Sequence, residues 1–148
     1  MKRNALSGLI ILWLSLSVSG YGRAMGDQDS STSKEKVTEQ KGAVLKTKSL
    51  EIDFSKYKAA FLELGSDRCI PCRQMQPIMK EIAASFPEDV LVVFYDVWED
   101  PAPARKYKVQ LIPTQIFIDA EGKEIFRHMG LYPKEEILKV LEKMGVRK

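Results

Sequence analysis

The chain has 148 residues, of which 45% are hydrophobic and 29% charged, and it carries 23 basic side chains, 20 acidic ones and two cysteines. Three of the basic residues, Lys2, Arg3 and Arg23, lie in the first 24 positions, so the remainder holds equal numbers of basic and acidic residues. Since this remainder has no net charge and no basic stripe interleaved with aromatic side chains, neither nucleic acid nor anionic lipid is expected as a partner.

The N-terminal segment has the order of a secretory signal peptide. Two basic residues precede an apolar run over about 5–18, and small residues follow it. The run is shorter than the roughly 20 residues that a membrane-spanning helix needs. We therefore expect residues 1–24 to be a signal peptide, cleaved near Ala24 or else after Gly20, and the protein to be periplasmic. An uncleaved membrane anchor is the less favoured alternative.

Residues 25–46 are polar, with charges of both signs and few apolar side chains. Such a segment cannot bury enough surface to order itself, so we expect a flexible linker. The 102 residues of 47–148 suit one compact domain with one core.

Strand and helix patterns alternate through this domain. Short apolar runs predict strands, and apolar positions at helical spacing predict helices. The expected elements are strands over 49–54 and 59–64, a helix from the cysteines to about 85, a strand over 90–97, a short helix over 101–107, strands over 115–118 and 124–128 joined by a hairpin turn, and a helix over 133–144. Their order predicts an α/β fold with a mixed central sheet and helices on both faces.

Both cysteines lie in the motif Cys69-Ile70-Pro71-Cys72. Pro71 suits the first turn of a helix, which places Cys69 at the helix N-terminus, where unpaired N–H groups and the helix dipole stabilise a thiolate. Cys72 would lie one turn further in and resolve the mixed disulfide that Cys69 forms. The motif therefore predicts a redox-active disulfide with Cys69 as its nucleophile.

A Cys-x-x-Cys motif has two other interpretations. A zinc site needs four ligands, and the chain offers no further cysteine and one histidine, His128, so no metal is expected. A purely structural disulfide across so few residues would remove little entropy from the unfolded chain. A binding module with such a disulfide remains the alternative function.

The order of elements resembles the thioredoxin fold over about residues 49–148. Pro77 within the cysteine helix, Tyr107, the Ile112-Pro113 pair before a strand, and Gly130 stand at positions typical of that family. The resemblance implies a thiol–disulfide oxidoreductase that acts on protein thiols or disulfides without a cofactor. It also implies a cis Ile112–Pro113 peptide bond beside the dithiol.

The same resemblance indicates how a client protein would bind. The backbone before the cis-proline would pair with an extended client segment, as an added strand pairs with a sheet edge. We expect the client to contact Ile112 and Pro113, together with Arg68, Ile70 and Pro71 around the cysteines.

Glu63 lies in the apolar run 59–64, six positions before Cys69, where the family carries a buried acid. Burial would raise its pKa, and the acid could then relay a proton to or from Cys72. The alternative is a strand glutamate that points to water. The family's buried lysine near this acid is replaced by Phe94, so Glu63 would lack its usual charge partner.

The chain also departs from the cytosolic thioredoxins that it resembles: beside the motif, Arg68 and Gly65 stand where those proteins carry two tryptophans. Arg68 should favour a Cys69 thiolate unless Asp67 neutralises it. We expect Trp98 to pack in the core, with a place beside the dithiol as the alternative.

His128 is expected to face solvent from an edge strand, without a catalytic role. The proline before Cys72 matches the reducing members of the family, so we expect a monomeric reductase that receives electrons from a membrane thiol carrier. A thiol oxidase of the same fold is a further alternative.

Overall fold

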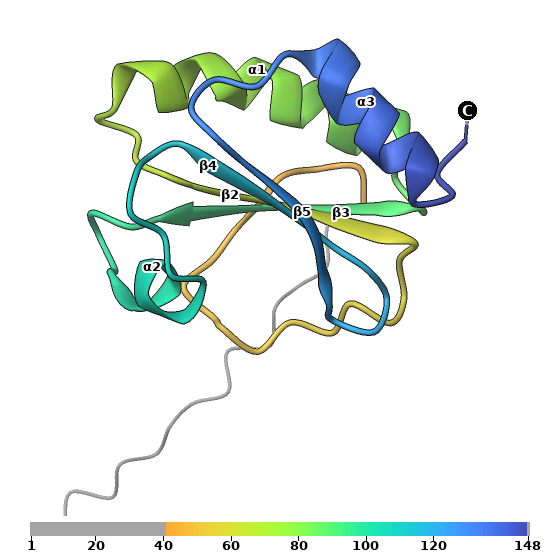
Figure 1. The fold of residues 1–148 in the computed structure, drawn as a ribbon, viewed down its shortest axis with the longest axis horizontal. Helices are drawn as coiled ribbons and strands as arrows, with labels where there is room; N and C mark the ends of the chain where they lie inside the picture. The colour runs from red at the N-terminus through yellow and green to blue at the C-terminus, as the bar shows by residue number, and fades with distance from the viewer. Residues whose placement is uncertain (1–40, 148) are drawn as a thin grey trace, which may run out of the picture. The chain divides into compact units, whose positions relative to one another are not determined.

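The computed structural model describes residues 41–147, which contain a five-stranded mixed sheet between two layers of helix (Figure 1). The expected signal peptide, 1–24, and most of the expected linker, 25–46, lie outside these residues. In chain order the elements are β1 (Leu45–Lys46), β2 (Ala59–Gly65), α1 (Ile70–Ser85), β3 (Val90–Asp96), α2 (Ala102–Lys106), β4 (Thr114–Ile118), β5 (Glu124–Met129) and α3 (Lys134–Lys143).

The strands lie in the order β1-β3-β2-β4-β5. Strands β1 and β2 run parallel to β3, whereas β4 is antiparallel to β2 and β5 is antiparallel to β4. Helices α1 and α3 cover one face of the sheet, and α2 lies on the other (Figure 1). Because helices cover both faces, every residue of the central strands β2 and β3 is buried. The α/β thioredoxin fold expected from the sequence is confirmed.

Alternation along the strands divides the core into two halves. Phe61 of β2 and Phe117 of β4 face α1 and α3, and their rings stack with centroids 5.1 Å apart. Leu62 and Leu64 face the opposite side, where α2 packs. Glu63 therefore points from β2 toward the layer that contains α1.

Helix α1 begins at the cysteine motif and runs for 16 residues. Met75, Met79 and Ile82 recur on its inner side and are fully buried against the sheet. Pro77 lies inside the helix, where its ring removes one backbone donor, yet the helix continues to Ser85. Within the described part of the chain, no helix is both long and apolar enough to cross a membrane.

The segment before β2 differs from expectation in two ways. No strand forms over 49–54; Leu50, Ile52 and Phe54 alternate as in a strand, but they pack against the core from irregular backbone. Strand β1 instead falls inside the expected linker, where its two residues pair with Val93 and Phe94 of β3. Two residues are too few to produce a recognisable alternation, so the sequence places the start of the domain slightly too late.

Candidate active site

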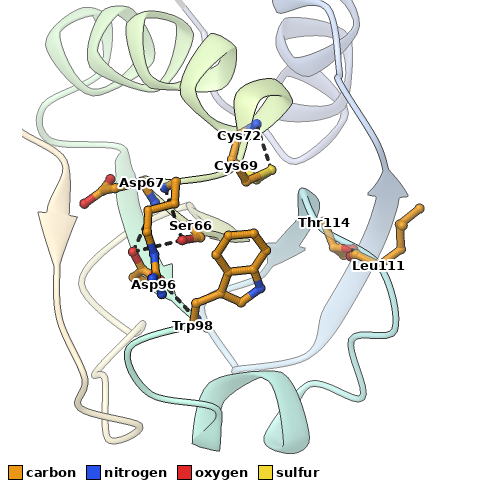
Figure 2. The surroundings of a disulfide bond; sticks show 9 residues. Ser66, Asp67, Cys69, Cys72, Asp96, Trp98, Leu111 and Thr114 are labelled. Atoms are coloured by element: carbon orange, nitrogen blue, oxygen red, sulfur yellow. Dashed lines mark hydrogen bonds between the residues drawn. A yellow bond between two sulfur atoms is a disulfide. The ribbon is translucent and has the colours of Figure 1, made fainter.

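Cys69 and Cys72 form a disulfide across the first turn of α1, with their Cα atoms 5.3 Å apart (Figure 2). Cys69 is the N-cap residue of the helix, and its Sγ accepts a hydrogen bond from the backbone N–H of Cys72 at 3.4 Å. Cys69 retains 7% of its surface exposed, whereas Cys72 is fully buried. A second molecule can therefore reach only the outer sulfur of the pair.

Glu63 lies at the inner end of this site and is fully buried. The alternative in which it points to water is wrong, because β2 is a central strand and helices cover both faces of the sheet. Burial raises the pKa of Glu63 to about 8, against a smaller lowering by the Gln115 amide. The acid therefore titrates close to the ordinary range of a thiol, about 8 to 9.

Gly65 leaves the space between the acid and the inner sulfur open. A Cβ atom on Gly65 would lie 3.2 Å from Cys72 Sγ and 3.3 Å from Glu63 Oε1, both tighter than ordinary van der Waals contact. The sulfur and the carboxyl oxygen thus both lie close to the point that a side chain at position 65 would occupy. The sequence shows Gly65 only as the position of a missing tryptophan and gives no sign of this role.

Asp96, at the end of β3, ties the cysteine loop to the turn that follows β3 (Figure 2). Its carboxylate accepts hydrogen bonds from the Ser66 hydroxyl at 3.3 Å and from the backbone N–H groups of Asp67 at 3.0 Å, Trp98 at 3.0 Å and Glu99 at 3.2 Å. Burial acts to raise the pKa of Asp96, but these hydrogen bonds outweigh it and hold the pKa below its ordinary value. Asp96 is not among the site residues predicted from the sequence, although an acid directly after an apolar run was an available signal.

Arg68 and Trp98 lie together beside the disulfide. The guanidinium carbon of Arg68 is 5.4 Å from the centre of the indole ring. Asp67 does not neutralise this charge, because its carboxylate pairs with Lys46 at 2.6 Å. Trp98 is 53% exposed, so its expected place in the core is wrong: β3 ends two residues earlier, and the indole is left at the surface.

The Ile112–Pro113 peptide bond is cis. Pro113 is buried and Ile112 partly buried, and Thr114 Oγ1 donates a hydrogen bond to the carbonyl oxygen of Leu111. Figure 2 shows Leu111, Thr114 and Trp98 in the surroundings of the disulfide, each on a different segment from the cysteine helix.

Two exposed apolar side chains lie in the surroundings of the disulfide, one of which, Leu111, is drawn in Figure 2. Ile70 is 66% exposed in the first turn of α1, next to the exposed Pro71, and Leu111 is 56% exposed. The residues expected to contact a client are thus at the surface, apart from Pro113 and the partly buried Ile112.

His128 was expected to face solvent. In the structure it is half-buried, and its ring stacks on that of Tyr132 with the ring centres 4.2 Å apart.

A disulfide with one reachable sulfur, on a helix end of this fold, can exchange with the thiols or disulfides of another protein. The fold and the site together therefore define the protein as a thiol–disulfide oxidoreductase. The chain belongs to the thioredoxin-like domain family, whose model matches residues 39–145.

Known relatives agree with this assignment. Thioredoxin from Chlamydia trachomatis is 33% identical over 82 residues, which are 55% of this chain and 78% of that protein. Thioredoxin from Staphylococcus aureus is 36% identical over 75 residues, or 51% of this chain and 71% of the relative.

Solved structures show the same fold. A point-mutant thioredoxin from Halobacterium salinarum superimposes with a TM-score of 0.65 at 21% identity, covering 74% of this chain and 96% of its own. A thioredoxin from Nicotiana alata gives a TM-score of 0.60 at 26% identity, covering 71% of this chain and 95% of its own.

Proposed function

We propose that the protein is an exported, monomeric reductase of protein disulfides, in which Cys69 attacks, Cys72 resolves and Glu63 takes up the proton that Cys72 loses. The observation that carries the proposal is the difference in exposure between the two cysteines: Cys69 keeps 7% of its surface exposed, and Cys72 is fully buried near Glu63. This difference suits the two steps of disulfide exchange, because a client can reach Cys69, whereas only Cys69 can reach Cys72.

In the first step the Cys69 thiolate of the reduced protein attacks one sulfur of a client disulfide. A bond forms between Cys69 and that sulfur, the client S–S bond breaks, and the other client sulfur leaves as a thiolate that takes a proton from solvent. The N–H group of Cys72, the helix N-terminus and the adjacent cation of Arg68 favour the negative charge on Cys69.

In the second step Cys72 attacks Cys69. The internal disulfide forms, the second client sulfur is released as a thiolate, and two electrons have then passed from the dithiol to the client. Cys72 must first lose its proton in a place that water does not reach. The Glu63 carboxylate and this sulfur lie near the same point beside Gly65, and the raised pKa of the acid nearly matches that of a thiol, so proton transfer between the two groups is close to balanced.

The client is proposed to lie as an extended segment along the Ile112–Pro113 backbone, in contact with Arg68, Ile70 and Pro71. The exposure of the residues around the outer sulfur supports this place, since Ile70 offers apolar surface and the residue before Cys69, Arg68, carries a cation. Protein thiols and disulfides are the substrates of the class.

Reduction as the direction, and the periplasm as the place, rest on sequence features. The proline before Cys72 resembles the reducing members of the family, and the signal-peptide pattern lies in residues 1–24. A reductase outside the cytoplasm must receive two electrons for each client disulfide, which we assign to a membrane thiol carrier. Recovery of a secreted form that begins near residue 25 would test export, and an uncleaved form in the membrane fraction would contradict it.

A thiol oxidase is the second candidate, because Asp67 does not neutralise Arg68. A stabilised thiolate favours the dithiol form and makes the disulfide more oxidising. Equilibration of the protein with glutathione buffers separates the candidates: the reductase should fall near the thioredoxin potential, about −270 mV, and a value near about −120 mV would identify the oxidase. Failure to reduce insulin with a chemical electron donor would favour the binding module.

A further inference from the structure

Gln115 of β4 is the direct cross-strand neighbour of Glu63 of β2. Paired residues of antiparallel strands project from the same face of a sheet, so the amide and the carboxyl lie side by side beneath α1. Both residues are fully buried. On the other side of Glu63, the paired residue of β3 is Phe94, which offers no polar group.

These two side chains hold unpaired polar atoms. Among residues 41–147, no hydrogen bond of ordinary geometry satisfies either carboxyl oxygen of Glu63 or either amide atom of Gln115, although the amide lies close enough to lower the pKa of the acid. Buried polar groups are costly without a partner, and the best partner for each side chain is the other one. A glutamine amide can donate through Nε2 to a carboxylate and accept through Oε1 from a protonated acid, so it can pair with Glu63 in both protonation states.

The remaining geometry decides which way the acid faces. Glu63 Oε1 and Cys72 Sγ lie 3.3 and 3.2 Å from the same point, the position that a Cβ atom on Gly65 would occupy. A carboxyl with one oxygen paired to Gln115 would keep its other oxygen directed at the sulfur. We propose that Gln115 is a positioning residue, whose amide holds the Glu63 carboxyl toward Cys72 and sets the pH range in which the acid accepts a proton.

The proposal rests on the relay role of Glu63 given above. The titratable groups near the pair are Cys69 and Cys72 at the start of α1, Asp96 further along β3, and His128, which pairs with Gln115 from β5. None of them contributes to the pKa shift of Glu63: burial raises this pKa, and the Gln115 amide lowers it by a smaller amount. Removal of the amide should therefore raise this pKa further.

The test compares Gln115→Met, which keeps an unbranched side chain without the amide, with Ile116→Met, a buried control on the opposite face of β4. The carboxyl ¹³C shift of Glu63 is followed against pH in the oxidised protein, where no Cys72 thiol is present to couple with the acid. The rate at which the reduced protein resolves a mixed disulfide is measured over the same pH range.

We expect Gln115→Met to raise the midpoint of the Glu63 titration by about one pH unit. At pH values below that midpoint, the rate at which the mixed disulfide is resolved should fall about tenfold. Ile116→Met should leave both curves unchanged. If the methionine variant does not fold, Gln115→Asn, which withdraws the amide by one carbon, should shift the titration in the same direction. An unchanged Glu63 titration in both Gln115 variants would overturn the proposal.

The two proposals fail differently. If Glu63→Gln resolves mixed disulfides at the normal rate at every pH, Glu63 is not the relay. A shifted Glu63 titration in Gln115→Met would still support the pairing of amide and acid.

Discussion

The guanidinium of Arg68 lies against the exposed face of Trp98, with 5.4 Å between its central carbon and the ring centre. The acid next to it in sequence, Asp67, is paired with Lys46 instead. An aromatic face attracts a cation without cancelling its charge. A positive charge is thus kept on the residue that precedes the outer sulfur, Cys69.

Removal of this charge should make the protein more reducing. Arg68→Gln is expected to raise the pKa of Cys69 and to shift the potential to a more negative value, by up to about 30 mV for each tenfold change in thiolate stability. Equilibration with glutathione measures the shift. Asp67→Asn is the matched control, and because the Asp67 carboxylate pairs with Lys46, its effect should be the smaller one.

Substitution of each cysteine should give different products. Cys72→Ser is expected to accumulate a mixed disulfide with client protein, because the reachable sulfur remains and the resolving sulfur is gone. Non-reducing gels of the purified variant incubated with a disulfide client would reveal the adduct. If Cys69→Ser accumulates the adduct and Cys72→Ser does not, the roles are reversed.

Glu63→Gln should become more stabilising relative to the natural protein as the pH rises. The pKa of Glu63 is raised from 4.5 to about 8, so the folded protein binds a proton that the unfolded chain has lost between these values. The contribution of Glu63 to stability is fully present below about pH 4.5 and is lost as the pH rises through 8, with an upper limit of about 5 kcal/mol. Denaturant unfolding of both proteins at pH 4.5 and 9 measures the difference, and a constant gap would contradict the buried acid.

Asp96→Asn should loosen the loop before the cysteines. Loss of the anion weakens hydrogen bonds to Asp67, Trp98 and Glu99, at an expected cost of about 1 to 3 kcal/mol. Because the pKa of Asp96 is lowered in the folded protein, its contribution is present above the unfolded pKa and is lost as the pH falls through the folded value. Faster amide hydrogen exchange at these three residues would show the effect. Unchanged exchange rates would mean that the Asp96 carboxylate does not hold the loop in place.

Gly65→Ala should hinder resolution of the mixed disulfide. The added methyl group would lie 3.1 Å from Cys72 Cβ and 3.3 Å from Glu63 Oε1, so one of these side chains must move. We expect a loss of about 1 to 3 kcal/mol in stability, together with a slower second step and an unaffected first step. Stopped-flow measurement of both steps would distinguish this from a general loss of activity.

Most of the fold could be predicted from the sequence because its elements carry local signals. The apolar run of β3, the helical spacing after Cys72 and the turn between β4 and β5 each depend on nearby residues, and every predicted helix and strand boundary from 59 onward lies within one residue of the observed one. The segment 49–54 shows the limit of that method. Its apolar side chains do alternate, but the alternation reflects their packing against the core and not pairing with a neighbouring strand.

The site could be predicted where the motif itself carries the chemistry, as at Cys69 and Cys72. It could not be predicted where function depends on contacts distant in sequence. Asp96 is linked to Asp67 across 29 positions, and Gln115 lies beside Glu63 only because β4 pairs with β2 in that register. No local pattern encodes these contacts.

The depth of Cys72 also affects how the protein withstands oxidants. A peroxide can reach only the outer sulfur, Cys69, where it forms a sulfenic acid. The inner sulfur lies one helical turn away and condenses with that acid, closing the disulfide and releasing water before a second oxidation to the irreversible sulfinic acid. The burial of Cys72 would thus also return accidental oxidation of Cys69 to the ordinary disulfide, which a thiol donor could reduce again.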